Sequence, residues 1–96
     1  MVADLEKQFY NYLVAHGKKE YTAAGRKSTV YSYCNRIDKI CEREHMTWEQ
    51  VAENIDAVLP KYDVGGSEEA YGMSSAKTPI NALRSFANFA RERKNR

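Results

Sequence analysis

The stretch "TPINALRSFANFARERKNR", Thr78 to Arg96, decides the fold of this chain, because it predicts one long helix with two different faces. At about 100° per residue, its apolar side chains share one side: Ile80, Leu83, Phe86, Ala87 and Ala90. The other side alternates cations with amides: Lys77, Asn81, Arg84, Asn88 and Arg91. Within this stretch, no carboxylate occurs before Glu92. The apolar face predicts packing in a helical core, and the ordered polar face raises the question of what it contacts.

Two more helices are predicted upstream by apolar periodicity. The first spans about Val2 to His16, ends at Gly17 and has this core stripe: Leu5, Phe9, Tyr12 and Leu13. The start of the second is open between Thr22 and Ser28, since both residues are plausible N-caps and Gly25 weakens the turn between them. Its core stripe comprises Val30, Tyr33, Cys34, Ile37, Ile40 and Cys41.

The third predicted helix begins at a capping box formed by Thr47 and Gln50. We expect it to bury Trp48, Val51, Ile55, Val58 and Leu59. The Gly- and Ser-rich segment "VGGSEEAYGMSSA" (64–76) is predicted to be a loop. The last helix follows, with Pro79 in its first turn and either Ser75 or Thr78 as its cap. No segment alternates long enough to predict a strand, so the expected class is all-α, a single compact domain over residues 1–96.

Length and composition favour a small cytoplasmic protein. The 96 residues suit one modest core. No apolar run approaches the roughly 18 residues of a membrane span, and the N-terminus does not resemble a signal peptide. Cys34 and Cys41 lie two helical turns apart, too far for a bridge within one helix, and lack a Cys-x-x-Cys spacing. We therefore expect buried thiols, no metal and no cofactor.

The net charge of +2 hides a division along the chain. Residues 18–43 carry seven cations against three acids, and residues 74–96 carry six cations against Glu92. Residues 44–73 carry Lys61 against seven acids. Two basic segments around an acidic one indicate an anionic partner for the basic parts. The alternative is that the acidic segment packs beside the basic ones and neutralises them.

The polar face of the second helix resembles that of the last one in its chemistry. It presents Ser28, Ser32, Asn35 and Lys39, with Tyr31 and two arginines at its margins. Lys and Arg neutralise phosphates, Ser and Tyr donate to phosphate oxygens, and Asn can bond a base edge. Both faces together are typical of a nucleic-acid-binding protein.

Three segments also resemble a known family. "STVYSYCNRIDKI" (28–40), "WEQVAENIDAVLPKYDVGG" (48–66) and "SSAKTPINALRSFANF" (74–89) are similar to the helices of the SAM-like N-terminal, or core-binding, domain of phage integrases and other tyrosine recombinases. The resemblance covers about Leu5 to Ala90. It implies a compact four-helix SAM-like bundle that clasps double-stranded DNA, with the second and fourth helices facing the major groove. The chain would then be one domain of a longer recombinase.

The resemblance also implies DNA-facing positions. On the second helix these are Lys27, Ser28, Tyr31, Ser32 and Asn35, to which the basic face adds Lys39. On the last helix they are Lys77, Thr78, Asn81 and Arg84, to which the amide row adds Asn88. The sequence departs from the commoner pattern in having Lys77 where many members have His, and in the extra "TAAGRK" (22–27) before Ser28.

We expect this chain not to be an enzyme. The family's catalytic Arg, Lys, His, Arg and Tyr belong to a separate C-terminal domain, and neither Tyr10 nor Tyr71 has the basic cluster that a phosphoryl-transfer nucleophile needs. The expected partner is duplex DNA, with no membrane, no small-molecule substrate and a monomer in isolation. The alternative is a protein-protein interaction domain that uses complementary acidic and basic faces.

Overall fold

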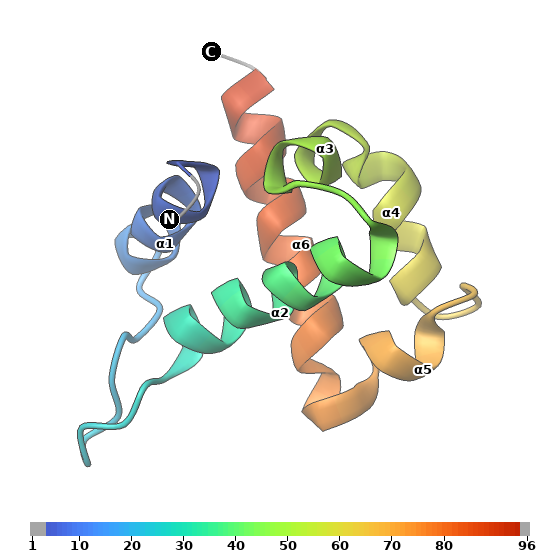
Figure 1. The fold of residues 1–96 in the computed structure, drawn as a ribbon. Helices are drawn as coiled ribbons and strands as arrows, with labels where there is room; N and C mark the ends of the chain where they lie inside the picture. Colours follow the sequence, from blue (N-terminus) through green and yellow to red (C-terminus); the bar gives the residue numbers. More distant parts are fainter. Residues whose placement is uncertain (1–3, 95–96) are drawn as a thin grey trace.

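Helix α6 (Ser74–Lys94) is the element on which all the others pack, as Figure 1 shows in a computed structural model that describes residues 4–94. The other helices are α1 (Asp4–Ala15), α2 (Thr29–Glu44), α3 (Trp48–Glu53), α4 (Ile55–Tyr62) and α5 (Glu69–Gly72). The expected all-α class is confirmed, since the described residues form no strand beyond an isolated bridge between Tyr21 and Lys27. No helix among residues 4–94 has the length and apolar character needed to cross a membrane.

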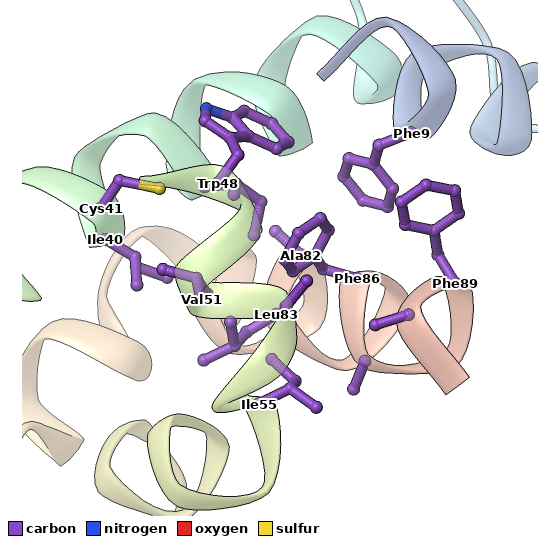
Figure 2. Packing of buried hydrophobic residues seen from close by; sticks show 14 of the residues in the cluster. Phe9, Ile40, Cys41, Trp48, Val51, Ile55, Ala82, Leu83, Phe86 and Phe89 are labelled. Atoms are coloured by element: carbon purple, nitrogen blue, oxygen red, sulfur yellow. The ribbon is translucent and has the colours of Figure 1, made fainter. Parts of the chain in front are cut away.

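The core follows the predicted apolar stripes. Phe9 of α1 meets Phe86 of α6 edge to face with ring centroids 5.1 Å apart, and Trp48 of α3 meets Phe86 at 5.5 Å (Figure 2). All five apolar residues predicted for the last helix are buried. The Trp48 indole N–H donates to a carboxylate oxygen of Asp38 at 2.7 Å, so its polar edge is satisfied. With a radius of gyration of 12.9 Å, the bundle is as compact as expected for a chain of about 100 residues.

The predicted third helix is two helices, because the chain breaks at Asn54. The capping box of Thr47 and Gln50 is present as predicted. At the break, the Asn54 side-chain amide and backbone N–H both donate to the Gln50 carbonyl, at 2.9 and 3.0 Å. An Asn side chain that competes for a backbone carbonyl favours a helix end. The change of direction lets α3 bury Trp48 while α4 buries Ile55.

The glycine-rich segment is more ordered than predicted, since Glu69–Gly72 forms the single turn α5. A Cβ on Gly72 would lie 1.9 Å from the Tyr62 carbonyl oxygen, and one on Gly66 would lie 2.1 Å from that of Pro60. Glycine is therefore required where this segment crosses the end of α4. Such close backbone approach is a tertiary constraint that the local turn pattern did not reveal.

Helix α6 begins with an irregular turn. Ser75, Ala76 and Lys77 have left-handed dihedral angles, with φ values of 49°, 59° and 66°, and helical geometry resumes at Thr78. Pro79 therefore falls in the first regular turn, as predicted. The Thr78 hydroxyl donates to the Ser75 carbonyl at 2.7 Å. This turn places Lys77 on a bend ahead of the regular helix.

Candidate nucleic-acid interface

The segment between α1 and α2 forms a small hairpin that extends away from the helices (Figure 1). Thr22 and Arg26 are paired across it, with the Thr22 N–H donating to the Arg26 carbonyl at 2.8 Å. The Gly25 N–H donates to the Thr22 carbonyl at 2.9 Å, and Gly25 has a φ of 81°. A three-residue turn with glycine in the left-handed position is a common hairpin connection. The Ser28 N–H then donates to the Glu20 carbonyl at 2.8 Å. Ser28 occupies the N-cap position of α2 without a side-chain capping hydrogen bond, so the second helix begins at Thr29.

A cluster of tyrosines joins this hairpin to the bundle. The Tyr10 hydroxyl donates to a Glu20 carboxylate oxygen, and this hydrogen bond is the main reason that the pKa of Tyr10 is raised. The Tyr31 hydroxyl lies 3.0 Å from that of Tyr21, and the Lys27 ammonium lies 5.0 Å from the centre of the Tyr31 ring. Tyr31 was predicted to face DNA. In the structure it is half-buried and holds the hairpin against α1 and α2.

The structure brings several predicted site residues together where the hairpin, α2 and α6 meet. Lys27, Ser28 and Ser32 share a shallow depression of about 400 Å³ with Thr78, the first regular residue of α6. Thr22 of the hairpin and Thr29 also line it. Hydroxyl groups beside a lysine can donate to phosphate oxygens. The beginnings of α2 and α6 thus contribute to one polar surface.

A second depression of about 400 Å³ adjoins the first and shares Lys27 and Ser32 with it. Asn35 and Tyr31 line it, but so do the carboxylates of Glu6 and Asp38. Burial, and then the neighbouring Asp38 carboxylate, raises the pKa of Glu6. These acids make the second depression less suited to a phosphate than the first.

The other predicted site residues are placed differently. Lys39 and Asn88 are exposed but line neither depression, while Asn81 is half-buried one turn beyond Thr78. Lys77 is exposed on the left-handed turn, next to Thr78 in the chain. Arg84 donates to a carboxylate oxygen of Asp63 at 3.0 Å. The candidate surface is therefore centred on the N-terminal ends of α2 and α6 and does not extend evenly along α6.

Four ion pairs occur among the described residues, and three of them join a basic segment to the acidic one. Their nitrogen–oxygen distances lie between 2.6 and 3.1 Å, and the pairs are Arg43–Glu68, Arg84–Asp63, Arg91–Asp56 and Lys61–Glu44. The alternative that acidic residues neutralise basic ones is thus observed, but only for Arg43, Arg84 and Arg91.

Eight exposed cations have no acidic partner within ion-pairing distance in the part of the chain that the structure describes: Lys7, Lys18, Lys19, Arg26, Lys27, Lys39, Lys77 and Arg93. Four of the eight lie on the hairpin, and the other four are spread over α1, α2 and the two ends of α6. Of the four hairpin cations, only Lys27 was predicted to be a site residue, because the start of the second helix was left open between Thr22 and Ser28 and no hairpin was expected there. The signal that could have found the hairpin is Thr22-Ala-Ala-Gly25, a turn-forming sequence with glycine at its end.

The cysteines do not offer an alternative site. Burial, followed by the nearby carboxylates, raises the pKa of the Cys34 and Cys41 thiols to about 12 each, so neither is a ready thiolate. Within residues 4–94, no cluster of three or more His, Cys, Asp or Glu side chains is placed to hold a metal ion.

Comparison with known proteins gives no relationship. No protein-family model, curated protein or solved structure shows a significant match to this chain. The candidate surface must therefore be judged on its own chemistry.

Proposed function

We propose that this chain is a DNA-binding module, similar to the SAM-like core-binding domain of tyrosine recombinases, that clasps duplex DNA with α2 and the start of α6 in support of site-specific recombination. The observation that carries the proposal is the shared depression, where Lys27, Ser28 and Ser32 of the α2 end lie beside Thr78 of α6. Two helices that are far apart in the sequence present matching phosphate-binding groups there.

The distribution of charge supports the same surface. Three arginines remote from the depression, Arg43, Arg84 and Arg91, are paired with acids, whereas Lys27 and Lys77 near it have no acidic partner among the described residues. Unpaired cations gathered on one side raise the local potential and attract a polyanion. Asn81, one turn beyond Thr78, is the residue we assign to a base edge, since Asn can donate and accept at adenine.

The alternative interaction module is less well supported by the ion pairs. Four of the seven acids in residues 44–73 are already paired within the chain, namely Glu44, Asp56, Asp63 and Glu68. An acidic face that is largely neutralised internally has little charge left to recruit a basic partner. We therefore assign the free basic side to DNA.

A titration of the chain with a short duplex, followed by backbone amide resonances, tests the proposal. Shifts should gather on residues 28–39 and 77–81, and the dissociation constant should lie at about 10⁻⁴ to 10⁻⁶ M for a duplex without a specific site. Lys77→Ala should weaken binding, while the matched control Arg91→Ala, at the other end of α6, should not. Shifts confined to residues 44–73, or self-association without DNA binding, would refute the proposal.

A further inference from the structure

We infer that the hairpin of residues 18–27 is a separate phosphate-binding arm, which grips the DNA backbone outside the surface formed by α2 and α6. This inference rests on the proposed function and extends it. The residues it assigns are Lys18, Lys19 and Arg26, none of which lines either depression. They would contact the sugar–phosphate backbone without reading bases.

The hairpin carries an excess of positive charge. The hairpin carries four cations and one acid, Glu20, whose carboxylate is engaged by the Tyr10 hydroxyl. Lys18, Lys19 and Arg26 are all exposed, and no described acid pairs with them. Elsewhere on the molecule, exposed arginines near acids do form pairs, as Arg43 and Arg84 show. The hairpin is thus a local excess of positive charge.

The hairpin is also held in one conformation by its own hydrogen bonds, which a loop that is only solvated does not require. The Thr22 hydroxyl accepts from the Arg26 N–H at 3.2 Å, in addition to the backbone pairing across the turn. At the base of the hairpin the Val30 N–H donates to the Lys19 carbonyl at 3.1 Å. The Lys18 ammonium lies 5.9 Å from the centre of the Tyr33 ring. Cations on a preorganised element lose less conformational entropy on binding than cations on a flexible chain.

The hairpin also adjoins the proposed DNA surface. Thr22 and Lys27 of the hairpin line the same depression as Ser28 and Thr78, so a duplex seated on that depression runs past the hairpin. The hairpin projects beyond the bundle from this point (Figure 1). Its cations therefore meet phosphates that the helices do not reach.

The salt dependence of binding separates the arm from the helices. Each phosphate contact contributes about −0.9 to the slope of log binding constant against log salt, so Lys27, Lys39 and Lys77 alone predict a slope of about −3. Three further contacts from the arm bring it to about −5. We expect the chain to show the steeper value, measured by fluorescence anisotropy with a labelled duplex.

The test compares two triple variants that remove the same charge. Lys18→Ala, Lys19→Ala and Arg26→Ala together should reduce the slope to about −3 without changing sequence preference. Lys7→Ala, Arg91→Ala and Arg93→Ala together remove three cations from α1 and the end of α6, and should leave the slope near −5. Circular dichroism verifies that both triple variants fold. A second hairpin variant, with Gln in place of Ala at the same three positions, removes the charges but keeps most of the side-chain length.

The outcomes distinguish the arm from the proposed function. If the hairpin variants keep the slope while Lys77→Ala loses affinity, the arm is refuted and DNA binding by the helices stands. If both triple variants lose slope equally, only net charge matters and the arm is again refuted. If the unaltered chain does not bind duplex DNA, both proposals fail. Loss of self-association in the hairpin variants, with DNA binding unchanged, would assign the arm to a second copy and refute the inference.

Discussion

Replacing Asp63 by Asn tests whether Arg84 reaches DNA or is held away from it. One guanidinium nitrogen of Arg84 donates to Asp63 Oδ1 at 3.0 Å, and the same oxygen accepts from the Val64 N–H at 2.8 Å. Asn keeps that oxygen as an acceptor but removes the charge that holds Arg84. The substitution therefore frees the arginine with little change to the turn after α4.

The size of the effect follows from the exposure of the pair. The Arg84 side chain is 51% exposed and that of Asp63 is 36% exposed. Exposed ion pairs contribute about 0–1 kcal/mol, so Asp63→Asn should lower the free energy of unfolding by less than about 1 kcal/mol. If Arg84 must leave Asp63 to contact a phosphate, the same energy opposes DNA binding. Since about 1.4 kcal/mol is tenfold in affinity, freeing Arg84 should tighten binding by up to about fivefold.

A double-mutant cycle with Arg84→Ala isolates this contribution. Fluorescence anisotropy gives the dissociation constant for the duplex in both backgrounds. Asp63→Asn should improve binding clearly when Arg84 is present and only slightly when it is absent. Equal improvement in both backgrounds would mean that only the lost negative charge matters, and no improvement in either would remove Arg84 from the interface.

Three further predictions concern stability. Leu83→Ala should cost about 2–5 kcal/mol in urea unfolding, because the side chain is fully buried. Gly72→Ala should cost about 3 kcal/mol or more in the same assay, at the upper end of overpacking costs, since its Cβ would lie 1.9 Å from the Tyr62 carbonyl oxygen. Glu44→Gln should make the free energy of unfolding fall less steeply in acid, measured by urea unfolding at several pH values. Burial opposes ionisation of Glu44, but hydrogen bonds from Lys61 and Tyr62 prevail and lower its pKa. The stabilisation from the Glu44 carboxylate is therefore present above pH 4.5 and lost below it.

Matched variants give each of these a control. Leu59→Ala, at a half-buried position, should cost less than Leu83→Ala. Gly17→Ala meets no atom within 4 Å and has a φ of 83°, so it should cost only the roughly 1–2 kcal/mol of a left-handed residue. Equal losses at Gly17 and Gly72 would show that crowding at Tyr62 is not the cause. An unchanged acid profile in Glu44→Gln would mean that other carboxyl groups govern it.

The helices and their buried faces could be predicted because both depend on local periodicity. The residues predicted to be core in the last helix are all buried, and the capping box at Thr47 is present. Apolar residues that recur with a 3.6-residue period indicate which side of a helix is buried, whatever the helix packs against. Tyr12, Tyr33 and Leu59 are only half-buried, because they lie at the edges of their stripes.

The remaining features depend on contacts between distant segments. The break at Asn54 allows two short helices to bury different residues, and α5 exists where Gly72 crosses Tyr62. The left-handed turn at Ser75–Lys77 connects α5 to α6 in a way that no local preference for non-glycine residues favours. Periodicity contains no information about such crossings, so these elements could not be placed from the sequence.

The division of charge shows why a candidate site cannot be read from residue type alone. Arg84 and Lys77 were predicted with equal weight on one face, yet Arg84 is paired with Asp63 while no described acid pairs with Lys77. A cation already paired must break that contact before it neutralises a phosphate, so the two differ in what they offer DNA by up to about 1 kcal/mol. The hairpin shows the converse, because its unpaired cations gain importance only when their order and position are known. For this chain, the proposed DNA surface is therefore the place where unpaired cations gather, at the hairpin and the first turns of α2 and α6, whereas Lys7 and Arg93 are unpaired but lie away from it.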